Sequence, residues 1–236
     1  MRIWPIAIAG VGGLLLLLTG RKALAATPTG GSVSEDAKIK KIVASANKYG
    51  IPPAVALAIA DVESGGSSGF AKDGRMIIRF EPKTFDNRYM VKQKKPTGMV
   101  PADRGGQAKE WAMFDKASAI DPIAAKKSIS MGMFQIMGFN YDVCNYPNVD
   151  EMFKAFSTSQ DAQIQGFFDF CSKITGDAYE NGPQIRLDKA AREGNFLVFA
   201  RGYNGRGQKG YDVKMKKRYD YWVKKGYAGI GSGSVA

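Results

Sequence analysis

The sequence predicts an α+β fold that is mainly helical, with one small β element after the second helix of the folded part. Apolar residues recur at helical spacing in most segments between residues 36 and 225. The segment MIIRFEP, residues 76–82, instead has β-branched and aromatic residues between turn formers. Hydrophobic residues make up 44% of the 236-residue chain and charged residues 24%, which excludes a largely disordered protein.

The N-terminus carries an apolar run that is long enough to span a membrane. Residues 3–20 contain no charged side chain, with Arg2 before them and Arg21 and Lys22 after them. The run is either an uncleaved hydrophobic helix or an export signal cleaved near Ala23–Ala25. The charges that follow it favour the uncleaved helix. We therefore expect a transmembrane helix and a location at a membrane or in the cell envelope, with export to the periplasm or association with a virion as alternatives.

Four segments are expected from the changes in composition along the chain. Residues 1–22 form the membrane anchor or signal segment, and residues 23–35, which are rich in Gly, Ser and Thr, form a flexible linker. The folded domain covers residues 36–227. The glycine-rich residues 228–236 form a flexible tail.

Two helices are expected at the start of the folded domain. Residues 36–49 place apolar side chains at helical spacing with lysines outward, and Gly50 ends this helix. Pro52 and Pro53 suit the first turn of a second helix, because the amide hydrogens that proline lacks have no partner there. The segment AVALAIADVE, residues 54–63, then reads as a short buried helix that the following Ser-Gly-Gly sequence closes.

The rest of the domain alternates between turn-rich and helical segments. In chain order we expect a strand at MIIRFEP, an exposed loop at 96–106, a helix at 107–119, a Gly- and Met-rich segment at 128–139, and helices at 153–174, 185–203 and 211–225. In the helix at 153–174, Ser157 with Gln160 three residues later is typical of a helix cap.

Charge and composition restrict the function. The net charge of +12 favours an anionic partner, such as nucleic acid, anionic lipid or the bacterial envelope. The chain has no histidine, which excludes Ser-His and Cys-His nucleophilic catalysis and makes a zinc site improbable. No metal and no cofactor are expected. Cys144 and Cys171 form either one disulfide or two buried thiols, and the sequence leaves both open.

Three short blocks carry the functional signal: VESGG at 62–66, SMGMFQIMGFN at 130–140 and ARGYNG at 200–205. Their order resembles the lysozyme-like superfamily, including goose-type lysozymes and family 23 lytic transglycosylases. With the flanking segments DGRMIIRFEP and YDVK, residues 37–225 closely resemble the phage-type N-acetylmuramidase family of endolysins. The resemblance implies a lysozyme-like fold and cleavage of the β-1,4 bond between N-acetylmuramic acid and N-acetylglucosamine in peptidoglycan.

Glu63 is the expected general acid. Cleavage of a glycosidic bond requires a proton on the leaving oxygen, and a carboxylic acid holds that proton near neutral pH only when its pKa is raised. The apolar helix before Glu63 should desolvate its side chain and favour the neutral form, as an apolar pocket does for the catalytic acid of lysozyme. The negative end of the helix dipole acts in the same direction. A surface glutamate at a helix end is the alternative without a function.

The other two blocks supply expected substrate-binding residues. The resemblance implies that Ser130, Gly132 and Gln135 line the cleft, and Gly132 would let a sugar approach the backbone closely. A buried amide such as that of Gln135 requires a partner or a ligand. Tyr203 can hydrogen-bond or stack on a sugar, whereas Asn204 also suits a helix C-cap.

The second carboxylate is expected to be Glu81, with Asp73 and Asp86 as weaker candidates. Inverting hydrolysis needs a base that activates water, and retaining hydrolysis needs a closer nucleophile. Glu81 could equally be an exposed residue paired with Arg79 or Lys83. If no second carboxylate reaches the site, a hydroxyl of the substrate attacks and an anhydro sugar results, as in lytic transglycosylases.

Two other functional classes fit the sequence less well. A lysozyme-like structural or binding module without activity is disfavoured because the residues of all three blocks are intact. A nucleic-acid binder ranks last, because no basic and aromatic reading motif accompanies the lysines. We expect a monomer that acts on peptidoglycan glycan strands.

Overall fold

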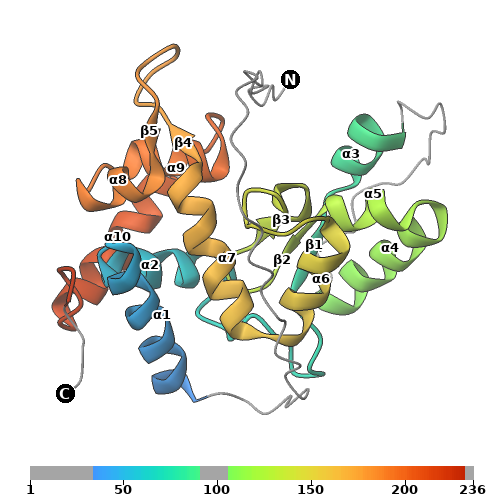
Figure 1. The fold of residues 1–236 in the computed structure, drawn as a ribbon, viewed down its shortest axis with the longest axis horizontal. Coiled ribbons are helices and arrows are strands. Elements are labelled where there is room, and N and C mark those ends of the chain that lie inside the picture. Colours follow the sequence, from blue (N-terminus) through green and yellow to red (C-terminus); the bar gives the residue numbers. More distant parts are fainter. Residues whose placement is uncertain (1–33, 91–105, 232–236) are drawn as a thin grey trace, which may run out of the picture.

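The computed structural model describes residues 34–90 and 106–231 and confirms a mainly helical α+β fold (Figure 1). The α-helices are α1 (Glu35–Tyr49), α2 (Pro53–Ser64), α3 (Pro82–Thr84), α4 (Gln107–Ile120), α5 (Pro122–Lys127), α6 (Val149–Thr158), α7 (Gln160–Lys173), α8 (Leu187–Arg192), α9 (Phe196–Asn204) and α10 (Tyr211–Lys224). The strands are β1 (Ile78–Phe80), β2 (Ile129–Met131), β3 (Ile136–Met137), β4 (Thr175–Gly176) and β5 (Ile185–Arg186). A π-helical turn, η1 (Phe85–Met90), and a 3₁₀ turn, η2 (Gly138–Asn140), complete the elements.

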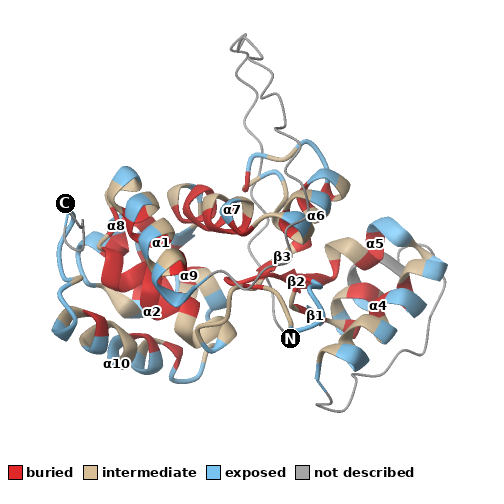
Figure 2. Ribbon diagram, turned by 90° about the horizontal axis from the view of Figure 1, so that it is seen from below, coloured by how far each residue is buried: buried red, intermediate tan, exposed pale blue. Residues whose placement is uncertain are grey.

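The elements form two lobes along the long axis of the molecule. The α2 lobe contains α1, α2, α7–α10 and the β4–β5 hairpin, and the sheet lobe contains β1–β3 with α3–α6 (Figures 1 and 2). Helix α6 packs on α5, whereas α7 packs on α1 and α8, so this helical pair joins the lobes. One hydrophobic core runs through both.

Helix α2 lies at the centre of its lobe, as its apolar sequence predicts. Residues 53–60 are buried on every side, and α1 and α10 pack against the helix. Gly65 ends α2 with a left-handed φ of 62°, and Gly66 continues with φ of 78°. The chain therefore turns sharply just after Glu63.

Side chains of α4 cover the outer edge of the β1–β2–β3 sheet. The Gln107 amide accepts from the Ile78 N–H and donates to the Ile78 carbonyl, both at 2.9 Å. Glu110 accepts from the Phe80 N–H at 2.8 Å. These polar side chains satisfy the backbone groups that a further strand would otherwise bind.

Two turns, one after α2 and one between β2 and β3, are held by polar side chains of α7. Gln163 accepts from the Met133 N–H and donates to the Phe156 carbonyl, both at 2.8 Å. Gln160 donates to the Ser68 carbonyl at 3.1 Å, in the loop after α2. Gln163 lies so close to Gly132 that a Cβ there would come within 2.4 Å of it. Gly132 is therefore required for packing.

Four expected helices are confirmed, at α1, α2, α4 and α10. The single helix expected at 153–174 is wrong, because the chain breaks at Ser159 (φ −141°, ψ 118°) between α6 and α7. The Ser159 hydroxyl caps α7 by accepting from the Ala162 N–H at 3.1 Å, so the capping serine is not Ser157. A break that is capped in this way costs little free energy. The apolar periodicity continues on both sides of it, so the sequence pattern resembles that of one long helix.

The helix expected at 185–203 is also divided. It consists of β5, α8 and α9, separated at Gly194 (φ 65°) and at Asn195, which caps α9. The single β element expected was incomplete, because the Gly- and Met-rich segment supplies β2 and β3, and β4–β5 forms a second hairpin. Strands of two or three residues are too short to show an alternating pattern.

The two cysteines are free, buried thiols. Burial raises the pKa of both Cys144 and Cys171 above the ordinary thiol value. Of the two possibilities left open by the sequence, the structure therefore contains the pair of thiols.

The expected transmembrane helix is contradicted. Within residues 34–90 and 106–231, no helix combines the length and the apolar character needed to cross a bilayer. The apolar run at 3–20 lies outside these residues, as does most of the loop expected at 96–106. The location at a membrane, in the envelope or on a virion rested on that helix and is corrected with it. The boundaries expected for the four segments stay predictions.

Gly132→Ala should destabilise the fold by about 2–4 kcal/mol, because it adds left-handed strain and a clash with a side chain held by two hydrogen bonds. Gly74→Ala is the control: its φ is 79°, but an added Cβ would meet nothing within 4 Å. It should cost only about 1–2 kcal/mol. Chemical denaturation measures both, and equal losses would contradict the packing role assigned to Gly132.

Candidate active site

Glu63 lies in the last turn of α2, at the side that faces the start of α10. The Tyr211 hydroxyl donates a short hydrogen bond to Glu63 Oε1, which joins residues 148 positions apart in the sequence. Glu63 is only partly exposed. The carboxyl is thus held between two helices and not displayed to bulk water, as the predicted acid requires.

Burial raises the pKa of Glu63 from its ordinary value of 4.5 to about 7. Two smaller effects oppose burial and lower the pKa: the hydrogen bond from Tyr211 and the positive charge of Arg79. A carboxyl with this pKa holds its proton below about pH 7 and can still release it near neutrality, which suits a general acid.

Tyr211 is the residue of the site that the sequence analysis missed. It begins α10, its ring stacks on Tyr203 at 6.2 Å between centroids, and its N–H donates to Gln208 Oε1 at 2.7 Å. Gln208 lies in the loop between α9 and α10. This loop also contains Arg206, which forms an ion pair with buried Asp177 of the β4–β5 hairpin. The sequence contained one indication of Tyr211: it is the first residue of YDVK, a segment that contributed to the family resemblance.

Asp177 is suited to hold this loop in place. Burial raises the pKa of Asp177. The hydrogen bonds from Arg206 and Gln184 lower it by more than burial raises it, so the net shift is downward and the carboxylate stays charged. The hairpin thereby fixes the loop that delivers Tyr211 to Glu63.

Ser130 of β2 is brought together with Gly132 and Gln135 of the following β2–β3 turn. The Ser130 hydroxyl donates to Gln135 Oε1 at 2.7 Å, and Gln135 Nε2 donates to the Gly132 carbonyl at 2.8 Å. Gln135 has a left-handed φ of 48°, which is strained for a residue with a side chain. Its amide has partners within the protein, so its contact with a sugar stays a prediction.

Arg79 links the predicted second carboxylate to the acid. It lies on β1 opposite Ser130, its Nε is 3.2 Å from Glu81 Oε1, and its charge acts on Glu63. This ion pair agrees with the interpretation of Glu81 as a residue paired with Arg79. The role of Glu81 as the second carboxylate stays a prediction. The weaker candidate Asp73 pairs with Arg75 at 2.8 Å, and Asp86 lies in η1.

A model of the N-acetylmuramidase family matches residues 52–223. The chain belongs to the N-acetylmuramidase family. The muramidase is also similar to a solved structure, described as "Crystal structure of Burkholderia AP3 phage endolysin". That similarity has a TM-score of 0.60 and 29% identity, and it covers 80% of this chain and 70% of the endolysin chain. No curated protein matches the sequence.

The matched residues include all the candidate site residues and confirm the resemblance inferred from the three blocks. A peptidoglycan glycosidase is therefore supported at the level of the family. In the described part of the muramidase, no group of three or more acidic, cysteine or histidine side chains could hold a metal ion.

Tyr203 and Asn204 lie at the end of α9 in different environments. The Tyr203 ring stacks on Phe199, and its hydroxyl donates to the Phe134 carbonyl at 2.5 Å, in the β2–β3 turn. Burial raises its pKa well above the ordinary value, so the hydroxyl stays neutral. The Tyr203 ring stacks on Tyr211, the partner of Glu63, and Asn204 is exposed. Substrate contacts of both residues stay predictions.

Tyr211→Phe should shift the alkaline limb of the kcat/KM profile of the muramidase to higher pH. The hydroxyl stabilises the charged carboxylate, so its removal raises the Glu63 pKa above about 7 while burial remains. The limb should move by up to about one pH unit, equivalent to roughly 1.4 kcal/mol.

Tyr203→Phe is the matched control for this measurement. It also removes a buried hydroxyl, but one that donates to a backbone carbonyl and not to the acid. Its limb should stay at the wild-type pH. A limb that moved equally in both variants, or in neither, would remove Glu63 as the group that titrates.

Proposed function

We propose that this muramidase cleaves the β-1,4 bond between N-acetylmuramic acid and N-acetylglucosamine in peptidoglycan, with Glu63 as the general acid. The observation that carries the proposal is the Glu63 carboxyl, whose burial raises its pKa to about 7 beside a hydroxyl and a guanidinium. The similarity to a phage endolysin supports a role as a phage or prophage enzyme of lysis or cell entry.

The surroundings of Glu63 favour its neutral form before the reaction and stabilise its charged form afterwards. Burial keeps the proton on the carboxyl until a glycosidic oxygen arrives. When the proton moves to that oxygen, the carboxylate that forms already has the Tyr211 hydrogen bond and the Arg79 charge. Interactions that strengthen as charge develops lower the barrier more than interactions of constant strength.

Glu81 is the proposed second carboxylate. Its ion pair with Arg79 ties it to the guanidinium that acts on Glu63. As a base it would activate the water that attacks the sugar. In the alternative reaction, that of a lytic transglycosylase, a substrate hydroxyl attacks and Glu81 only orients Arg79. A non-catalytic lysozyme-like module is a third possibility, and the raised pKa of Glu63 argues against it.

Peptidoglycan glycan strands are the proposed partner, and the net charge of +12 suits an anionic wall. The same charge would suit nucleic acid, and the low rank of that partner stays a prediction. The expected monomer stays a prediction.

Glu63→Gln should lower the release of soluble fragments from purified peptidoglycan by about 10²–10⁴-fold, because the amide has no proton acidic enough to transfer to the leaving oxygen. The change is nearly isosteric, so the thermal midpoint should stay close to that of the wild type. Retained turnover in a folded variant would remove the catalytic assignment.

Glu81→Gln should lower the rate of hydrolysis by about 10²-fold or more if Glu81 activates water. Asp73→Asn is the matched control, since it changes another carboxylate paired with an arginine two residues away. Mass spectrometry of the wild-type products distinguishes the two reactions: reducing-end muramic acid indicates hydrolysis, and the anhydro form indicates transglycosylation. An anhydro product would exclude Glu81 as the base for water.

A further inference from the structure

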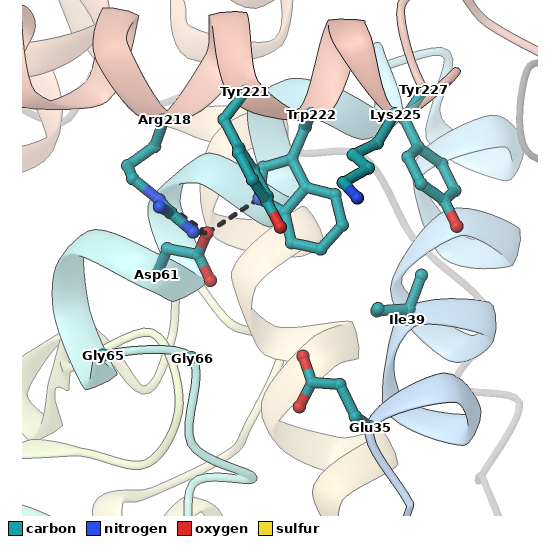
Figure 3. Close-up of a pocket in the computed structure, with 10 residues that line it drawn as sticks. All are labelled: Glu35, Ile39, Asp61, Gly65, Gly66, Arg218, Tyr221, Trp222, Lys225 and Tyr227. Carbon is teal, nitrogen blue, oxygen red and sulfur yellow. Dashed lines mark hydrogen bonds and ion pairs between the residues drawn. The ribbon is translucent and has the colours of Figure 1, made fainter.

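A groove lies beside the turn that follows Glu63. It has a volume of about 460 Å³ and lies between α1 and α10, over the end of α2 (Figure 3). Gly65 and Gly66 form part of its wall, whereas Glu63 and Tyr211 do not. The groove is therefore separate from the acid but starts two residues beyond it.

One side of the groove presents carboxylates. Asp61 Oδ2 accepts from Arg218 Nε at 2.8 Å and from Trp222 Nε1 at 2.7 Å. Its other oxygen, Oδ1, faces Gly66, where an added Cβ would lie 3.0 Å away. Glu35 of α1 points into the same space (Figure 3), with its side chain 62% exposed and one oxygen 2.7 Å from Lys38. This side of the groove suits a ligand amine.

The α10 side, which Asp61 contacts directly and which lies across from Glu35, is aromatic and cationic (Figure 3). Tyr221 lies between two cations, with the Arg218 guanidinium 4.6 Å and the Lys225 ammonium 5.8 Å from its ring centroid. Trp222 and Tyr227 pack edge to face at 5.5 Å beside it. Lys225 is exposed, and Figure 3 shows its ammonium directed into the groove. This side suits an aliphatic chain that ends in a carboxylate.

We propose that the groove binds the stem peptide of peptidoglycan through a residue that carries both a free amine and a carboxylate. The inference rests on the proposed function, because stem peptides hang from the muramic acid whose bond is cleaved. Without its stem, each N-acetylmuramic acid carries a single lactyl carboxylate and no amine, and N-acetylglucosamine is neutral. A groove with the Glu35 carboxylate on α1 and the Lys225 ammonium at the end of α10 matches a zwitterionic peptide end and not a bare sugar.

The kinetic test compares two forms of one polymer: peptidoglycan with intact stems, and the same strands after an amidase has removed the stems. Lys225→Glu and Glu35→Gln should each lower kcat/KM on the intact polymer by about three- to tenfold, as expected for single partly exposed charge contacts. Amidase leaves a lactyl carboxylate on the stripped strands, so on them Glu35→Gln should match the wild type and Lys225→Glu should lose no more activity than the same charge change at Lys224.

Lys224→Glu is the control, since it makes the same change of charge on an adjacent exposed lysine that does not line the groove. It should leave the ratio between the two polymers unchanged. If Lys224→Glu lowers that ratio as much as Lys225→Glu, a general electrostatic attraction replaces the groove. A loss that is equal on both polymers also overturns the proposal.

A binding measurement separates this inference from the proposed function. Calorimetric titration of the full chain with a free stem tripeptide ending in diaminopimelate should show binding that Lys225→Glu weakens by about three- to tenfold. Acetylation of the side-chain amine should weaken it similarly. Turnover of neither polymer by the wild type would refute the proposed function, whereas turnover without tripeptide binding at millimolar concentration would refute only the groove.

Discussion

Helix α10 lies along α2, and this contact determines the environment of the Glu63 carboxyl. Two acidic side chains near the end of α2 meet α10 in different ways. Asp61 accepts from a guanidinium and an indole, whereas Glu63 accepts from a single hydroxyl and is otherwise buried. Many donors compensate for a buried charge, but a single hydroxyl does not compensate fully. The same helix pair therefore keeps a structural ion pair and an acid that retains its proton close together.

The position of α10 depends in turn on segments that contain no proposed catalytic residue. Asp177 of the β4–β5 hairpin pairs with Arg206 in the loop before α10, and Gln208 of that loop receives the N–H of Tyr211. On the other side of the site, Gln163 of α7 occupies the space that Gly132 leaves open. The hairpin and α7 thus hold the loop before α10 and the β2–β3 turn through buried polar contacts, which have narrower geometric limits than apolar packing.

Local signals predicted four of the helices and the partly buried place of Glu63 at a helix end, but not the contacts between distant segments. The proline start of α2 and the glycine ends of α1 and α2 can be recognised within a few residues, and Glu63 lies next to such an end. The cap at Ser159 interrupts a periodicity that resumes at once, so it leaves no local trace. Tyr211 meets Glu63 only because α10 folds back on α2, which no local pattern encodes. Gly132 was predicted for its freedom, and the structure adds the side chain that requires it.

Arg79 couples the two proposed catalytic carboxylates and so complicates any interpretation of rates alone. Its charge lowers the pKa of Glu63 and is partly neutralised by Glu81 at 3.2 Å. Loss of the Glu81 charge would leave Arg79 acting more strongly on Glu63, which would lower the pKa of the acid and reduce the fraction that holds a proton near neutral pH. A slower reaction is therefore expected from this indirect effect as well as from loss of a base. The two roles of Glu81 differ in the product of the reaction. A base that activates water gives reducing-end muramic acid, whereas the reaction in which Glu81 only orients Arg79 gives the anhydro sugar. The identity of the product therefore discriminates between these roles, and the size of the rate loss does not.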